Sequence, residues 1–234
     1  DGELLFEKVK EALFLLDEGE NSIRHNRSRD IPKLRLGASS TLTRYVLLSH
    51  LENYIAHFPH VRITISCQST YQTLHLLDEE KIDLGLIGRP QKLRGYYFHP
   101  LLKIRDTFVC TRQYLENQKK LYPDEPLIQA ATFMMLDEDN ITRQTVNAQL
   151  KEHHVELSHI LEVTTMDLLI QFAEIGLGIA CVIRDFVKKE LEEGTLVEVP
   201  VGFSFPPREI GFVCRQKDAN LDLIVPFFGD GQGN

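Results

Sequence analysis

Small hydroxyl side chains are grouped at three points where an apolar, strand-like run gives way to a helix-like pattern. The groups are Ser39-Ser40-Thr41, Ser69-Thr70 and Thr164-Thr165. Ser and Thr favour helix starts because their oxygens accept hydrogen bonds from N–H groups that the first turn leaves unpaired. A helix N-terminus also carries a partial positive charge that attracts anions. These positions therefore indicate a binding site for a small anion.

One arginine stands where it could take part in the same chemistry. Arg89 directly follows the apolar run Ile82–Gly88 and precedes Pro90, so we expect it to project from the carboxyl end of a buried strand. Two interpretations remain open. Arg89 is either an exposed loop arginine or a guanidinium fork that pairs with a carboxylate or a sulfate-like group.

Motifs for catalysis and nucleotide binding find little support. Gly176 and Gly178 follow a helix-like segment and precede a strand-like one, which reverses the order of a dinucleotide-binding motif. A helix end with a tight turn is the better interpretation. No G-x-S-x-G motif surrounds Ser39 or Ser40. We therefore expect no cofactor and no enzymatic activity.

Metal-ligand spacings are equally weak. The pair His57 and His60 and the pair His153-His154 lack further ligands at a spacing usual for zinc. The acidic run 137–140 lacks the glycine and the later glutamate of a calcium-binding loop. We expect no metal site, and Asn140 is better interpreted as a helix cap.

The elements that must position these groups alternate between strands and helices. Leu34–Ala38 predicts a strand, Leu47–Phe58 a helix that Pro59 stops, and Val61–Cys67 an alternating strand. The same patterns predict helices over 71–80, 141–153 and 166–175, and strands over 82–88, 107–111, 133–136, 160–163, 179–183, 196–199 and 209–215, with a weak helical tail to 228. Such alternation implies parallel sheets with right-handed crossovers.

An internal echo suggests two lobes. The segment Phe108–Arg112 resembles Phe212–Arg215 about a hundred residues later. If one segment carries the chain into a second lobe and the other carries it out, they lie side by side, and Cys110 and Cys214 become neighbours. A cleft between two α/β lobes is a usual site for a small ligand, at the carboxyl ends of the strands.

The N-terminus differs from the rest of the chain. Apolar residues at near-heptad spacing form one stripe among Glu, Lys and Asp, at positions 5, 9, 12, 16 and 23. One interpretation is a terminal helix that folds back on its own domain. We favour a linker helix over 1–30 that pairs with another chain, which predicts a homodimer or homotetramer.

Composition limits the possible partners. The chain has 234 residues, 43% of them hydrophobic, so it can bury a core. Its net charge of −8 argues against nucleic-acid binding by this chain itself. No apolar run approaches the roughly 20 residues of a membrane span. The four cysteines lie in separate apolar runs, which favours buried thiols and a cytoplasmic location.

The order of these elements resembles the effector-binding half of the LysR-type transcriptional regulators, from about Glu3 to about Phe228. The resemblance implies an α/β fold with two Rossmann-like subdomains joined by two crossover strands, like type II periplasmic binding proteins, preceded by a linker helix. It implies one subdomain over 33–100 plus 208–228, a second over 101–207, and a loose tail over 229–234.

The resemblance also implies a site. In the first subdomain its residues match Ser39, Ser40, Thr41, Gln68, Ser69, Thr70, Gly88 and Arg89, and in the second Thr164, Thr165 and Met166. The expected ligand is a small-molecule effector such as a carboxylate, an amino acid or a sulfur oxyanion. Family members bind DNA through an N-terminal winged helix-turn-helix that this sequence lacks, so we expect no operator binding by the chain itself.

Two alternatives remain. An extracytoplasmic solute-binding protein of the same fold would not need the linker helix over 1–30. An enzyme on this fold would need an acid–base pair or a nucleophile in the cleft, for which Asp137 and Glu138 are the visible candidates.

Overall fold

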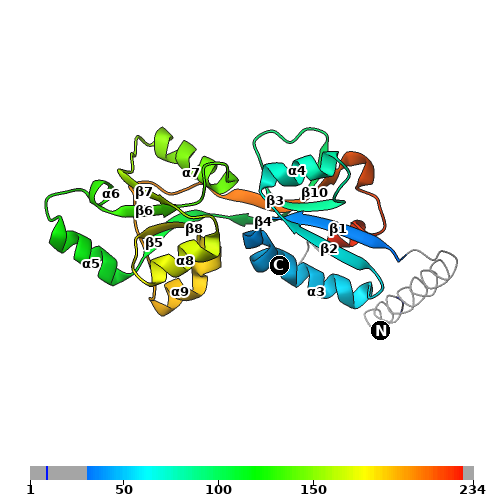
Figure 1. The fold of residues 1–234 in the computed structure, drawn as a ribbon, viewed down its shortest axis with the longest axis horizontal. Helices are drawn as coiled ribbons and strands as arrows, with labels where there is room; N and C mark the ends of the chain where they lie inside the picture. The colour runs from blue at the N-terminus through cyan, green and yellow to red at the C-terminus, as the bar shows by residue number, and fades with distance from the viewer. Residues whose placement is uncertain (1–8, 10–30, 229–234) are drawn as a thin grey trace.

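The described chain folds into two α/β lobes, one on each side of a narrow junction (Figure 1). A computed structural model describes Val9 and residues 31–228. Apart from Val9, the linker helix expected over 1–30 and the tail over 229–234 lie outside the described residues. The expected two-lobed architecture is confirmed.

The first lobe contains a mixed sheet in the order β2-β1-β3-β10-β4, where β1 runs parallel to β2 and β3, and β10 runs antiparallel to β3 and β4. The strands are β1 (Lys33–Ala38), β2 (Arg62–Cys67), β3 (Leu84–Gly88), β4 (Tyr96–Ile104) and β10 (Arg208–Arg215). The helices are α2 (Ser40–Leu42), the π-helix η1 (Thr43–Leu47), α3 (Leu48–His57) and α4 (Thr70–Asp78), followed at the C-terminal end by the 3-10 turns η3 (Gln216–Asp218) and η4 (Val225–Phe227).

The second lobe contains a mixed sheet in the order β7-β6-β8-β5-β9, where β6 runs parallel to β7 and β8, and β5 runs antiparallel to β8. The strands are β5 (Asp106–Cys110), β6 (Thr132–Met135), β7 (His159–Glu162), β8 (Ile179–Ile183) and β9 (Val197–Glu198). The helices are α5 (Arg112–Leu121), α6 (Leu127–Ala130), α7 (Ile141–Glu152), α8 (Met166–Glu174), the 3-10 turn η2 (Arg184–Val187) and α9 (Lys188–Glu193).

Apolar periodicity explains how the helices cover the sheets. Each lobe carries helices on both faces of its sheet, with α3 and α4 on opposite faces of the first (Figure 1). The strands β3 and β8 are therefore buried along their whole length, as expected for central strands of an α/β fold. One buried apolar cluster continues from the first sheet, with Leu36 and Phe212, into the second, with Met134 and Val182. The two lobes are consequently packed together.

The chain crosses between the lobes twice. It leaves the first sheet at Ile104 and enters the second at Asp106, and it returns to the first sheet at Arg208, which pairs with Ile104. Positions 101–104, expected in the second subdomain, thus complete β4 of the first sheet. The carboxyl ends of the parallel strands in both lobes are directed toward this junction.

The expected pairing of the two similar segments, Phe108–Arg112 and Phe212–Arg215, is wrong. The segment beginning at Phe108 lies in β5, which pairs with β8 and β9, whereas Phe212 lies in β10, which pairs with β3 and β4. The side-by-side crossing instead involves Ile104 and Arg208. Cys110 and Cys214 accordingly lie in different sheets.

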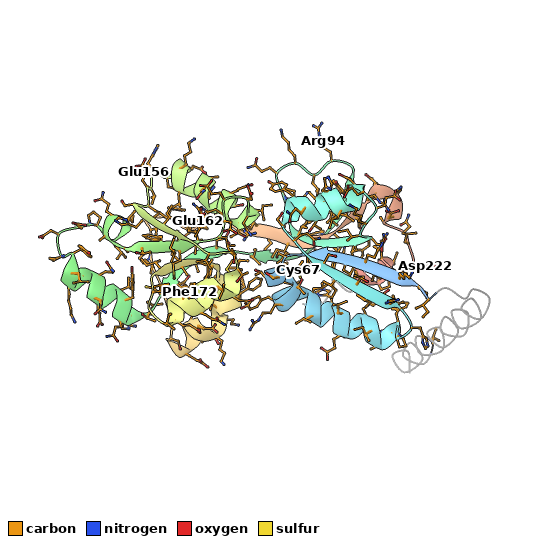
Figure 2. The ribbon with its side chains drawn as sticks, in the orientation of Figure 1. Cys67, Arg94, Glu156, Glu162, Phe172 and Asp222 are labelled. Atoms are coloured by element: carbon orange, nitrogen blue, oxygen red, sulfur yellow. The ribbon has the colours of Figure 1, made fainter. Side chains whose placement is uncertain are left out.

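Other local expectations also need correction. Cys67 is exposed at the end of edge strand β2, whereas the other three cysteines are buried, and all four are free thiols (Figure 2). The helical tail expected to 228 consists of the two short 3-10 turns η3 and η4. The elements β4, α5, α6 and α9 were not predicted. No helix among the described residues is long and apolar enough to cross a membrane.

Candidate functional site

A small, partly open pocket of about 40 Å³ lies between the lobes, where strands of both sheets end. Its first-lobe wall includes Ser39, Thr41, Ser69, Thr70 and Gly88. These residues follow β1 and β2 or, as Gly88 does, end β3, so the sheet topology brings together three strand ends that are far apart in the sequence. This convergence is typical of open α/β sheets, in which ligands bind outside the carboxyl ends of parallel strands.

The first-lobe hydroxyls cap helices. Ser39 Oγ accepts a hydrogen bond from the Leu42 backbone N–H over 3.2 Å. Ser69 Oγ accepts from the Gln72 N–H over 3.3 Å, while Gln72 Oε1 accepts from the Ser69 N–H over 3.2 Å, which completes a capping box. Because a hydroxyl accepts and donates at once, each capping oxygen retains an O–H that can donate to a ligand.

The second lobe supplies two more helix N-termini. Asn140 Oδ1 accepts from the Thr142 N–H over 2.9 Å at the start of α7, and both residues line the pocket with Ile141. Met166, the first residue of α8, also lines it. The N-termini of α4, α7 and α8 therefore meet at the pocket with the short α2. Together they create a positive potential without a lysine.

An arginine at the lobe junction completes the wall. Arg208 Nε and Nη2 donate to the two carboxylate oxygens of Asp106 over 2.7 and 2.8 Å. Nη2 also donates to Thr142 Oγ1 over 2.8 Å. The Asp106 side chain is 1% exposed and that of Arg208 is 13% exposed, so the ion pair is almost entirely shielded from water. Among the described residues that line the pocket, Arg208 alone is charged.

Arg89 faces a different environment. Its Nη1 donates to Glu209 Oε2 over 2.5 Å, and its guanidinium carbon lies 5.2 Å from the centroid of the Phe98 ring. The side chain is 53% exposed and does not line the pocket. Although Arg89 follows the pocket residue Gly88, the structure thus places its charge against Glu209.

The predicted residues divide into two groups. Those that line the pocket are Ser39, Thr41, Ser69, Thr70, Gly88 and Met166. Those that stand beside it without lining it are Ser40, Gln68, Arg89, Thr164 and Thr165. Thr165 caps α8 by accepting from the Leu168 N–H over 3.4 Å. The buried Nε2 of Gln68 finds no hydrogen-bond partner within residues 31–228.

Sequence reasoning missed several lining residues. The turn at Asn140 to Thr142 follows β6 in the same strand-to-cap-to-helix order as the other turns, so this signal was present but was interpreted only as a cap. Arg208 offered no local signal, because its partner Asp106 is 102 residues away. The apolar lining residues Leu42, Leu136, Ile183 and Ile210 read as ordinary core positions.

Polar contacts join the lobes on either side of the pocket. Tyr71 Oη of α4 donates to Gln144 Oε1 of α7 over 3.2 Å. Tyr45 Oη of η1 donates to Asp167 Oδ1 of α8 over 3.1 Å, and burial together with the Asp167 charge raises the pKa of Tyr45 to about 12. Arg44 forms an ion pair with the same carboxylate at 3.3 Å. The two lobes are therefore in direct contact on both sides of the pocket.

The described part of the chain contains no candidate metal site. Within Val9 and residues 31–228, no group of three or more His, Cys, Asp or Glu side chains is arranged to hold a metal ion. The site instead offers hydroxyls, backbone N–H groups and one guanidinium, which are hydrogen-bond donors suited to an oxyanion.

Comparison with known proteins gives a consistent result. A family model described as the LysR substrate binding domain matches residues 28–227. The HTH-type transcriptional regulator YeiE of Escherichia coli K12 is 24% identical over 211 residues, covering 86% of this chain and 66% of that protein. The chain thus spans just under two thirds of the length of this relative.

Solved structures show the same architecture. The regulatory domain of HypT from Salmonella typhimurium superposes with a TM-score of 0.67 at 16% identity, covering 80% of this chain and 88% of that one. A mutant of the OxyR2 regulatory domain from Vibrio vulnificus gives a TM-score of 0.64 at 20% identity, covering 84% and 95%. These structures share the two-lobed fold.

Proposed function

The chain belongs to the LysR substrate-binding domain family and is a ligand-sensing regulatory domain, and from this premise we propose that the inter-lobe pocket binds a small anionic effector. The observation that carries the proposal is the meeting of the N-termini of α4, α7 and α8 with capping hydroxyls at one small pocket. Each element contributes donors and positive potential, so an anion is the ligand that they complement.

The pocket size favours a compact anionic group. A water molecule needs about 10–15 Å³ of comparable cavity volume, so about 40 Å³ accommodates only a few heavy atoms. A carboxylate, the head of an amino acid or a sulfur oxyanion meets this limit. A larger effector would place its anionic group here and keep the lobes further apart.

We propose that lobe closure transmits the effector signal. An effector bridging Ser69 of the first lobe and Asn140 of the second stabilises the closed arrangement over an open one, because it gains contacts from both lobes only when they approach. The relative YeiE is named as an HTH-type transcriptional regulator. By analogy, this domain controls DNA binding by a helix-turn-helix segment, in the cytoplasm.

Self-association is part of the proposal. The edge strand β2 and the helix α3 expose Ile65, Leu48 and Ile55 at 39%, 56% and 51%. In the second lobe, β7 exposes Ile160 and Leu161 at 43% and 39%. Uncovered edge strands with apolar side chains favour association with another chain. A homodimer or homotetramer formed through these faces would let lobe closure change the spacing of two DNA-binding segments.

Calorimetry on the protein tests the ligand class. Sulfate, acetate and glycine are titrated at constant ionic strength, with chloride as the reference salt. Thr41→Ala and Ser69→Ala remove pocket hydroxyls, whereas Ser40→Ala removes a neighbouring hydroxyl that does not line the pocket. We expect at least one anion to bind, and both pocket variants to weaken it by about three- to tenfold, from roughly 1 kcal/mol per hydrogen bond. Equal affinity in all three variants would place the ligand elsewhere.

A further inference from the structure

We propose that Arg208 is the residue that anchors the effector's negative charge, and that Asp106 acts as the positioning residue that fixes its orientation. The inference deepens the proposed function and rests on it. Arg208 is the first residue of β10, where the returning chain passes the pocket, whereas Arg89, which follows β3, is exposed.

Some N–H donors of the Arg208 guanidinium make hydrogen bonds within the protein, and the others are left for a ligand in the pocket. Asp106 occupies the edge formed by Nε and Nη2, and the second Nη2 hydrogen is donated to Thr142 Oγ1. Arginine has five N–H donors, so the two on Nη1 remain. The hydrogen bonds that Arg208 donates to residues 31–228 all come from Nε and Nη2, so Nη1 is left for the pocket that this residue lines.

Gly88 makes room for these donors. A Cβ atom at Gly88 would lie 3.2 Å from Arg208 Nη1, which is tighter than an ordinary van der Waals contact. The glycine therefore lets the guanidinium lie against the carboxyl end of β3, where Nη1 reaches the first-lobe wall of the pocket. Arg208 is thus placed between Gly88 of one lobe and Thr142 of the other.

Thr142 supplies a second donor beside Nη1. Its oxygen accepts from Arg208 Nη2, so the hydroxyl hydrogen must point away from the guanidinium. An oxyanion beside Nη1 can accept from both groups. Arg208 of β10 and Thr142 of α7 thus form a pair of donors, one of them charged. A bound anion accepts a hydrogen bond from each.

The ion pair with Asp106 holds the guanidinium of Arg208 in its binding orientation before a ligand arrives. A buried guanidinium without a partner would be costly and would turn toward water. The bidentate pair with the 1%-exposed carboxylate keeps the guanidinium at the junction and presents one fixed edge to the pocket. Preorganisation of this kind reduces the entropy lost on binding.

The test compares two arginines that carry the same charge and each pair with a carboxylate, one buried beside the pocket and one half-exposed. Arg208→Gln is measured beside Arg184→Gln, whose parent side chain pairs with Glu198 at 3.1 Å outside the pocket. The probes are sulfate and acetate, and acetamide serves as the neutral isostere of acetate. Calorimetry gives Kd, and the side-chain nitrogen resonances of arginine report which guanidinium responds.

We expect Arg208→Gln to weaken the bound anion by about ten- to a hundredfold, as for a lost charge-assisted hydrogen bond, and Arg184→Gln by less than twofold. Arg208→Gln should also abolish any preference for acetate over acetamide. Because this change leaves Asp106 buried without a cation, the double variant Asp106→Asn/Arg208→Gln is the folding control. It should melt closer to the wild type than Arg208→Gln, yet bind the anion as weakly.

The outcomes separate the two proposals. Wild-type affinity in the folded Arg208→Gln or double variant, together with weakened binding in Thr41→Ala, overturns the anchoring role and leaves the proposed function standing. Absence of binding of sulfate, acetate and glycine to the wild-type protein overturns both. Anion-dependent resonance shifts confined to Arg208 support the anchor, and shifts confined to other arginines contradict it.

Discussion

Tyr45 of the first lobe stacks on Phe186 of the second, with ring centroids 4.3 Å apart and planes within 4° of parallel. Tyr45 belongs to the π-helix η1, which directly follows the short helix α2 that Ser39 caps. Single-turn π-helices are rare and frequently lie at functional sites. Here η1 carries the aromatic ring that joins the lobes, one turn from the proposed effector contacts.

Loss of this stack should loosen the closed arrangement. Tyr45→Ala removes the ring contact, worth about 0.5–1.5 kcal/mol beyond buried area, and the hydrogen bond to Asp167. We expect small-angle scattering to show a larger radius of gyration than in the wild type. Tyr97→Ala is the matched control, because Tyr97 packs on Phe228 within the first lobe. Identical scattering from Tyr45→Ala and the wild type would show that the Tyr45–Phe186 stack does not hold the lobes together.

Arg89→Ala should have little effect on effector binding. Its guanidinium is engaged by Glu209 and lies outside the pocket lining, so no ligand contact is lost. The ion pair is half-exposed, and such pairs contribute about 0–1 kcal/mol to stability. Calorimetry with sulfate or acetate should give a Kd within twofold of the wild type, and thermal melts a small shift. A tenfold loss of affinity would restore Arg89 as a ligand contact.

Thiol chemistry should distinguish one cysteine from three. Cys67 is exposed, whereas burial raises the pKa of Cys110 to about 12 and that of Cys214 to about 11, and raises the pKa of Cys181 well above its ordinary value. The thiolate is the reactive form. A thiol reagent at pH 8 should label one site in the native protein and four after denaturation. Cys67→Ala should remove the fast phase, and a persisting fast phase would contradict the assignment.

Stability should fall at alkaline pH. An unfolded cysteine ionises near pH 8.5, whereas burial holds the pKa of Cys110 at about 12 and that of Cys214 at about 11 in the folded state. The unfolded chain therefore loses these protons first, so stability is fully present below about pH 8.5 and is lost as pH rises toward 11–12. Burial likewise raises the pKa of Tyr54 to about 12, which adds to the trend.

Thermal melts between pH 7 and 10.5 measure this dependence. Cys110→Ala should flatten the decrease in melting temperature, because one buried thiol no longer contributes a shifted ionisation. Cys67→Ala should leave the profile unchanged, since the Cys67 side chain is exposed. A melting temperature that stays constant to pH 10.5 would show that the buried thiols do not govern alkaline stability.

Local patterns made much of the fold predictable. The segment from β1 through α3 carries its own signals: an apolar strand, a capping Ser39, a helical stripe and a stop at Pro59. By contrast, β4 mixes polar and apolar residues around Pro100 and is paired, within the described sheet, only with β10. The helix α5 buries only Tyr114, and its sequence is so rich in polar residues that the few apolar ones were not recognised as a helical stripe.

The site was predictable where it depends on local turns and unpredictable where it depends on register. In the register of β3 and β10, Gly88 pairs with Ile210. Beyond this pair, Arg89 forms an ion pair with Glu209, and Arg208 forms one with Asp106. Two arginines near one strand end therefore have different environments because of contacts spanning more than a hundred residues. Spacing in a single sequence carries no information about which of the two faces the pocket.

The position of β10 determines the order in which the protein can be completed. It lies between β3 and β4 in the first sheet, although it follows the whole second lobe in the chain. During synthesis from the N-terminus, β3 and β4 therefore wait without their shared partner while the second lobe, which uses one continuous segment, can assemble its own sheet. The lobe that emerges first is the last to close.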